Sequence, residues 1–164
     1  MMSDDMNEEY EHTQVGYVIL GAVLGVGVLG VVPALVLVES PGIGFWLIIG
    51  AVSVGALPFC SLTVRVTEDA LIWYFGPRFW RNTLPLSSIE RVERVRNSPL
   101  HGWGIRMLVD EWIYNVSGLD AVEIETSDGN VIRIGTDEPD QLATVLRETT
   151  QTGGDQKGVR RTLN

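Results

Sequence analysis

The sequence has almost no cysteine, and its first third has no cation. Cys60 is the only cysteine among 164 residues, so neither an intrachain disulfide nor a thiolate metal cluster is available. All twelve lysines and arginines lie at or after Arg65, eleven of them arginine, and the net charge is −9. Because phosphate contacts need clustered cations, this balance excludes a nucleic-acid partner. Acidity with arginine in place of lysine is typical of a salt-adapted, archaeal or halophilic composition.

Charge of either sign is absent from two long apolar runs. Residues 15–38 and 43–62 contain no charged side chain, and the turn-forming stretch Glu39-Ser40-Pro41-Gly42 separates them. At about 1.5 Å per residue, the first run as a helix is about 36 Å long, more than the roughly 30 Å hydrocarbon core of a bilayer. A cleaved signal needs a basic leader and a shorter apolar stretch. The pattern therefore predicts a transmembrane hairpin over residues 15–62.

The position of the cations predicts which way this hairpin is oriented. No base precedes the first run, whereas Arg65, Arg78 and Arg81 follow the second closely. By the positive-inside rule, we expect a multi-pass protein of the cell membrane with its acidic N-terminal tail, residues 1–14, and its C-terminal domain in the cytoplasm. Neither run contains an ionisable residue of the kind that marks a transport pathway, so a channel or transporter is not expected.

Glycine and alanine are spaced for close helix packing within the apolar runs. Gly21 and Gly25 are four residues apart, as are Ala51 and Gly55. Small residues at this spacing let helix backbones approach where lipid provides no hydrophobic driving force. They are expected to serve packing within the hairpin or between copies of a homo-oligomer.

From residue 63 onward, the sequence consists of short runs of alternating apolar and polar residues, with turn-forming residues every eight to twelve positions. This spacing predicts a small, mainly antiparallel β domain over residues 63–150, of about seven short strands arranged as a split barrel or sandwich. Leu62, Val64 and Val66 form the buried face of its first strand. Within residues 89–95, the apolar residues Ile89, Val92 and Val95 are three positions apart, which is a helical spacing. Their β-branched side chains favour a strand instead.

The clearest hairpin is AVEIETSDGNVIRIGT, residues 121–136. A three-residue loop places Ile124 opposite Ile132 and Glu123 opposite Arg133, whereas a two-residue loop would mix the two faces of the sheet. The first register is predicted, with Gly129 in the left-handed conformation of a bulge turn. The Glu123–Arg133 pair is expected at the surface, worth under about 1 kcal/mol.

A helix is expected after this hairpin, capped by Thr136 or Asp137. Leu142, Val145 and Leu146 give it an apolar stripe at helical spacing. This C-terminal helix is expected to close one end of the sheet. Residues 151–164 are polar and contain glycine, which predicts a disordered tail.

The order of these elements resembles the pleckstrin-homology (PH) architecture, in particular the bacterial and archaeal PH-like domains that follow one or two membrane spans. The resemblance is carried by LTVRVTEDALIWYFGP, LPLSSIERVERV and VEIETSDGNVIRIGTDEPDQLATVL, and covers about residues 62–149. It implies binding or scaffolding and no assigned chemistry, since fold does not fix function. Phosphoinositide-binding members carry basic residues in the first hairpin loop. Glu68 and Asp69 stand there in this chain, so inositol phosphate binding is not expected.

The first candidate site is the turn GPRFWR, residues 76–81. The first strand starts where the second apolar run ends and leads away from the bilayer, so the next strand returns this turn to the membrane. Aromatic side chains prefer the headgroup zone, and a cation gains about 1 kcal/mol near anionic lipid. Arg78, Phe79, Trp80 and Arg81 are therefore candidates for membrane-surface contact. The alternative is that the two aromatics fill the core and the arginines are ordinary surface charge.

The second candidate site is the aromatic-rich hairpin PLHGWGIRMLVDEWIYNVSG, residues 99–118, with strands at 102–108 and 112–116. Core packing is the simpler interpretation of its aromatics. As a ligand or partner surface it offers His101, Trp103, Arg106, Trp112 and Tyr114. Asn115-Val116-Ser117 is a glycosylation sequon, which a cytoplasmic domain would not use.

Catalytic chemistry has little support in the sequence. It contains no nucleophile motif, no metal-ligand spacing and no phosphate loop, and we expect no cofactor and no metal. We therefore expect a non-enzymatic, membrane-anchored binding or scaffolding module, whose partners are membrane lipids and a protein that the sequence does not identify. The alternatives are a lipid- or ligand-sensing domain with a groove at residues 101–114 and, third, a membrane enzyme.

Overall fold

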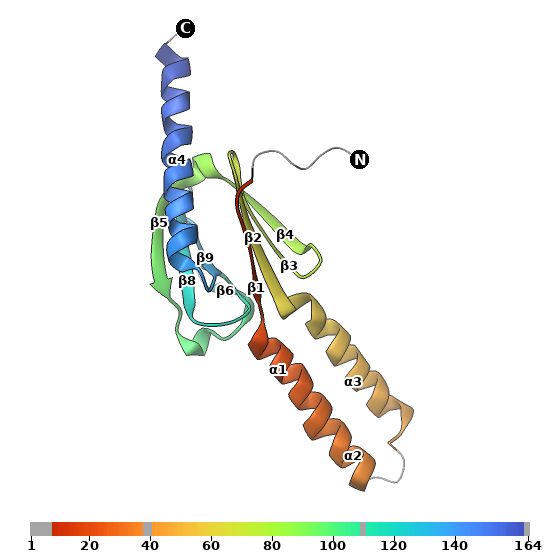
Figure 1. Ribbon diagram of the computed structural model, residues 1–164. Coiled ribbons are helices and arrows are strands. Elements are labelled where there is room, and N and C mark those ends of the chain that lie inside the picture. Colours follow the sequence, from red (N-terminus) through yellow and green to blue (C-terminus); the bar gives the residue numbers. More distant parts are fainter. Residues whose placement is uncertain (1–7, 38–40, 109–110, 163–164) are drawn as a thin grey trace, which may run out of the picture.

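A helical hairpin, two β-sheets and a C-terminal helix make up the computed structural model, which describes residues 8–37, 41–108 and 111–162 (Figure 1). The first sheet has the strand order β1-β2-β3-β4 and is antiparallel throughout. Its strands are β1 (Glu8–Val15), β2 (Ser61–Thr67), β3 (Ala70–Phe75) and β4 (Phe79–Pro85). The core face predicted for the first two strands after the apolar runs is confirmed, because Leu62, Val64, Val66, Leu71, Trp73 and Phe75 are all buried, although Thr63 and Ile72 on the opposite face are buried too.

The second sheet has the order β5-β8-β9-β7-β6. Its strands are β5 (Ile89–Arg96), β6 (Gly104–Leu108), β7 (Glu111–Asn115), β8 (Asp120–Thr126) and β9 (Val131–Gly135). The β7–β9 pair is parallel, which differs from the antiparallel sheet that was expected. The reason is that β9 follows β8 through a hairpin, so the chain reverses twice before β9 comes to lie beside β7.

The predicted register of the β8–β9 hairpin is confirmed. Ile124 pairs with Ile132, Glu123 pairs with Arg133, and Gly129 has a φ of +83°. The Glu123–Arg133 ion pair forms, with Arg133 Nε 2.6 Å from Glu123 Oε2, but it is not a surface contact. Both side chains are about four-fifths buried, and Glu111 lies 2.8 Å from the same nitrogen. Arg133 is thus held between two carboxylates on the outer face of the sheet.

The strand β1 corrects the sequence analysis, which assigned residues 1–14 to an acidic tail. It pairs with β2 along its length, with Thr13 opposite Thr63 and Val15 opposite Ser61. β1 is an edge strand, and an edge strand tolerates the charged residues that obscured its alternation. With β1 included, the described residues form nine strands rather than about seven.

The helical hairpin is inserted between β1 and β2. Its first helix consists of α1 (Tyr17–Val26), a π-helical turn η1 (Gly27–Val31) and α2 (Val32–Leu37). Its second consists of α3 (Ile43–Ala56) and a 3-10 turn η2 (Leu57–Cys60). The two ends meet where Gly16 N donates to Cys60 O over 2.7 Å. Val15 and Ser61, predicted as parts of the apolar spans, belong to strands instead, and Leu62, predicted both as the end of the second span and in the first strand, belongs to β2.

Both helices are long and apolar enough to cross a membrane, at 21 and 18 residues, and no part of either apolar window is buried within the protein. The expected close packing of glycines within the hairpin is not found at Gly21, Gly25 or Gly55, where an added Cβ would meet no heavy atom within 4 Å. Gly30 does face the second helix, 3.9 Å from Ile49 Cδ1. Homo-oligomer formation through the open glycines stays a prediction.

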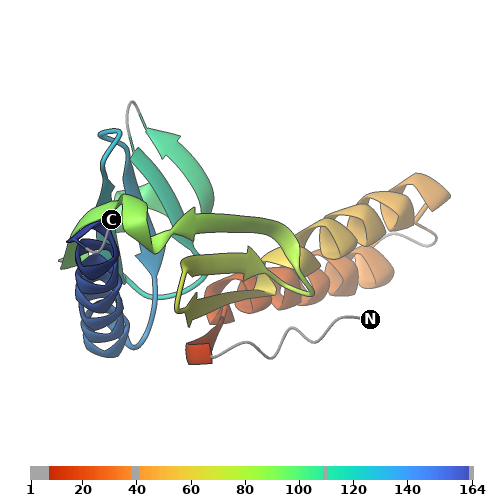
Figure 2. The same cartoon turned by 90° about the horizontal axis from the view of Figure 1, so that it is seen from above.

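Helix α4 (Pro139–Thr162) follows β9 and packs on β5 and β8 of the second sheet, on the side away from the helical hairpin, with further contacts to β1 at the edge of the first sheet (Figure 2). Its predicted stripe is confirmed, since Leu142 and Leu146 are fully buried and Val145 packs against the core. Thr136 Oγ1 accepts the Glu138 N–H, as a capping residue does. The backbone is helical as far as Thr162, so the disordered tail predicted for residues 151–164 is wrong over residues 151–162.

Candidate functional site

The turn between β3 and β4 lies beside the base of the second apolar helix. Gly76 N donates to Ser61 O over 2.9 Å, and a Cβ at Gly76 would lie 2.8 Å from Pro58 O. Glycine is needed here both for this close approach and for its φ of +51°. The chain therefore returns to the base of the second helix at Gly76, as the directions of the first two predicted strands require.

All four side chains predicted for this turn are exposed. Phe79 and Trp80 are 56% and 65% exposed, and both are far more open than the aromatics of the sheet core. Arg78 and Arg81 are exposed beside them. The alternative in which Phe79 and Trp80 fill the core is thus contradicted by their exposure.

The backbone of this turn holds the side chains outward at a conformational cost. Arg78 has a φ of 67° and Trp80 a φ of 51°, the two positive values among the described residues other than glycine. A bulky residue adopts this conformation only when its surroundings impose it, at a cost of about 1–3 kcal/mol. β3 and β4 also change register between Trp73 and Phe75. With this backbone, two aromatic and two cationic side chains of the turn are exposed near the base of the second helix.

Of the candidate residues in the 99–118 hairpin, the structure brings together Trp112 and Tyr114, whose rings stack with centroids 6.2 Å apart, but it does not bring all five to one site. Tyr114 is buried in the core, where its ring centroid lies 5.3 Å from that of Trp73. Arg106 is on the opposite face of the sheet, because it pairs with Ile113 whereas Ile105 pairs with Tyr114. Trp103 and Trp112 are 40% and 39% exposed. The side chain of His101 lies outside the described part of the structure.

The sequon at Asn115 is not available for modification in the folded domain. Asn115 is 1% exposed, donates to Gly118 O and accepts from Ser117 N. The absence of a glycan at this position would therefore say nothing about the side of the membrane on which the domain lies.

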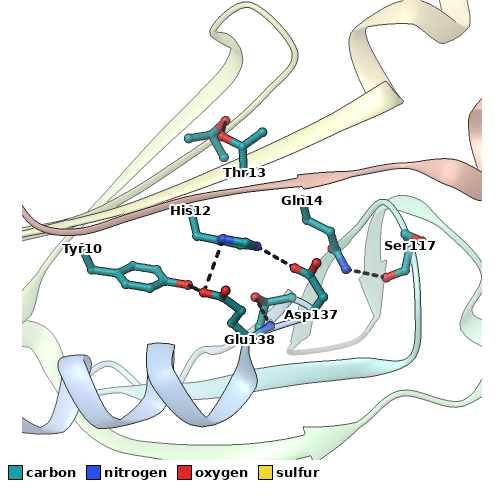
Figure 3. Close-up of polar contacts among 9 residues, drawn as sticks. Tyr10, His12, Thr13, Gln14, Ser117, Asp137 and Glu138 are labelled. Carbon is teal, nitrogen blue, oxygen red and sulfur yellow. Dashed lines mark hydrogen bonds and ion pairs between the residues drawn. The ribbon is translucent and has the colours of Figure 1, made fainter.

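A polar cluster that the sequence analysis missed joins β1 to the start of α4 (Figure 3). His12 Nε2 lies 2.6 Å from Asp137 Oδ1, and His12 Nδ1 lies 3.4 Å from Glu138 Oε2. Tyr10 donates its hydroxyl to the same Glu138 oxygen over 3.3 Å. The alternation of Tyr10, His12 and Gln14 with charged or polar neighbours is strand-like and could have identified β1, but not its partners in the cluster. These contacts anchor β1 to the helix rather than form a cavity.

Tyr10 of this cluster, together with Tyr114 of the core, makes the stability of the folded protein depend on pH in the alkaline range. Burial, and then the charge of Glu138, raise the pKa of Tyr10 above its ordinary value of 10.0, and burial also raises the pKa of Tyr114. The folded state therefore keeps protons that the unfolded state loses above that value, and stability falls as the pH rises further. We expect the thermal unfolding midpoint of the chain in nanodiscs to fall less steeply in Tyr10→Phe between about pH 9 and about pH 11. An unchanged slope would contradict this.

The chain matches no protein-family model, no curated protein and no solved structure. No group of three or more metal-binding side chains is found within the described residues.

Proposed function

We propose that the protein is a membrane-anchored binding or scaffolding module. Its helical hairpin spans the bilayer, and its PH-like β domain stands on the cytoplasmic surface. The exposed apolar helices support the anchor, because a helix from the core of a soluble protein would be mostly buried and these are not. The position of β1 also supports it. β1 precedes the first helix and is part of the folded domain, so cleavage after that helix would remove a strand of the first sheet.

The observation that carries the proposal is the turn at residues 76–81. Two exposed aromatics and two exposed arginines directly follow Gly76, which packs on the end of the second apolar helix, where a bilayer would present its headgroups. Aromatic rings are favoured in that zone and arginine gains from anionic lipid there. The turn thus rests on the headgroups and fixes how the domain stands relative to the membrane.

Hydrogen exchange of the full chain in nanodiscs tests this contact. Amides of residues 76–81 are expected to be better protected in nanodiscs containing phosphatidylglycerol than in those of phosphatidylcholine alone. The difference should shrink at high salt, because exposed charges are screened within about 10 Å at 0.1 M ionic strength. Arg78→Gln with Arg81→Gln should abolish it.

A charge-matched control is available on the other sheet. Arg91→Gln with Arg94→Gln removes the same two charges from exposed positions on β5. This variant should keep the lipid-dependent protection at residues 76–81. Equal protection in the two lipids for the parent chain would overturn the headgroup contact.

The ligand-sensing alternative has less support. It requires Trp103, Arg106 and Tyr114 to line one groove, and Arg106 and Tyr114 lie on opposite faces of the sheet.

A further inference from the structure

The exposed apolar side chains of the β domain are concentrated in two segments. Beyond residue 57, every large apolar side chain that is exposed among the described residues belongs to the β3–β4 turn or to the segment from η4 (Pro99–His101) to β7. The members are Phe79, Trp80, Leu100, Trp103, Met107, Leu108 and Trp112. Leu100 is the extreme case at 90% exposed. Such a concentration indicates contact surfaces rather than scattered surface residues.

Acidic residues are rare in these two segments: the only ones are Asp110 and Glu111, which are adjacent in the sequence just before Trp112. The chain has 21 aspartates and glutamates, but none falls within residues 70–89 or 97–109. These stretches do contain Arg78, Arg81 and Arg106. In a chain with a net charge of −9, apolar and cationic residues without acids are complementary to a surface that is both apolar and anionic.

Contacts with β1 and α1 place the second segment at the helix end of the domain. Gln14 Nε2 donates to Ser117 O over 3.2 Å, and a Cβ at Gly16 would lie 3.2 Å from Val116 O. The end of β7 therefore lies where the first apolar helix begins. Gly104, the first residue of β6, pairs with Asn115, the last residue of β7. Trp103 and η4 directly precede Gly104, and Figure 1 shows β6 at the lower end of the strands, from which α1 and α3 leave.

We propose that Leu100 and Trp103 form a second contact with the bilayer, at the boundary between headgroups and acyl chains. This inference rests on the proposed membrane anchor and extends it. The β3–β4 turn brings the first sheet into contact with the bilayer, and the η4 segment does the same for the second sheet. The domain is therefore held against the membrane at two points. Tryptophan is favoured at this depth, and leucine contributes apolar area. The helices that enter the bilayer beside this segment make lipid, rather than a protein partner, its occupant.

Quenching by brominated lipid tests the contact in the full chain reconstituted into vesicles of phosphatidylcholine and phosphatidylglycerol with bromine near the glycerol end of the acyl chains. The chain has five tryptophans, of which Trp73 is buried in the core and serves as a constant reference. Replacing Trp46, Trp80 and Trp112 by phenylalanine leaves Trp103 as the reporter. Equivalent triple variants leave Trp80 or Trp46, and a fourth variant with Trp73 alone gives the background.

The proposal expects Trp103 to be quenched to an extent comparable to Trp80. Quenching of Trp80 without quenching of Trp103 overturns this inference and leaves the proposed function intact. Failure to quench Trp46, in α3, overturns the membrane anchor itself and this contact with it. Emission of Trp103 that is blue-shifted but not quenched would mean that a protein partner or a second copy covers it, which also overturns the proposal.

A second measurement avoids the tryptophan replacements. In a Cys60→Ser background, Leu100→Cys carries a nitroxide label, and Ser127→Cys carries one in the exposed β8–β9 turn as the matched position. The label at residue 100 should be relaxed more by oxygen, which concentrates in lipid, than by a water-soluble nickel complex. The label at residue 127 should show the opposite preference. Equal accessibility to nickel at both positions would overturn the contact.

Discussion

A chain in which residues 17–56 are replaced by a short polar linker is expected to fold as a water-soluble β domain. The chain on either side of the removed segment is already joined, because Gly16 N donates to Cys60 O over 2.7 Å. The β1–β2 pair starts directly beyond them, at Val15 and Ser61. The helical hairpin is thus an insertion in a β-hairpin, and α1, α2 and α3 contain no buried residue. Removing them leaves the core between the sheets intact.

The shortened chain should retain residues 57–60, because Phe59 packs on Phe75 with ring centroids 5.6 Å apart. Size-exclusion chromatography should show a soluble species, and circular dichroism should show a β-rich spectrum with a cooperative thermal transition. Aggregation of this variant would contradict the view that the hairpin is an insertion.

The matched control is a chain that starts at residue 57 and so lacks β1 as well. It is expected to be insoluble or to unfold without cooperativity. β1 contributes Tyr10 and Gln14, both of which are buried. Its loss exposes the edge of β2 and the part of the core that these two side chains cover. A control as stable as the linked chain would show that β1 is dispensable.

The strands with one buried face could be predicted from the sequence because successive side chains of a strand point to opposite faces of the sheet. The alternation of apolar and polar residues therefore shows which side chains face the core. In β8 and β9, only one loop length puts the apolar residues of both strands on the same face, and that register is the one found. Alternation identified β2 and β3 for the same reason. The two apolar runs were equally visible, since helices of that length need no partner to be recognised.

Long-range pairing could not be predicted. Thr13 pairs with Thr63 across the whole helical insertion, and nothing local to residues 8–15 indicates that partner. The same difficulty hid the contact of His12 with Asp137, 125 residues away. The candidate turn at residues 76–81 was ambiguous for another reason. Positive φ angles at Arg78 and Trp80 break the alternation, so sequence parity does not say which side chains point outward.

Substitutions at Phe75 and Phe79 allow the stability of the core to be separated from the proposed lipid contact. The two phenylalanines are direct partners across β3 and β4, yet Phe75 is fully buried and Phe79 is 56% exposed. Phe75 joins three elements, because its ring contacts Phe59 at the helix base and Tyr114 of the second sheet. Phe75→Ala therefore leaves a cavity where these elements meet, at a cost of about 3–5 kcal/mol in the free energy of unfolding.

The exposed partner should behave in the opposite way. Phe79→Ala removes no core contact and should change the free energy of opening by less than about 0.5 kcal/mol. Hydrogen exchange of the β2 and β3 amides in nanodiscs measures both effects, because the most protected core amides report global opening. Phe79→Ala should lower protection at residues 76–81 in anionic nanodiscs, and Phe75→Ala should lower it throughout the sheet in either lipid. If Phe79→Ala destabilised the core as much as Phe75→Ala, the turn would be part of the packed domain and its role at the membrane surface would lose its physical basis.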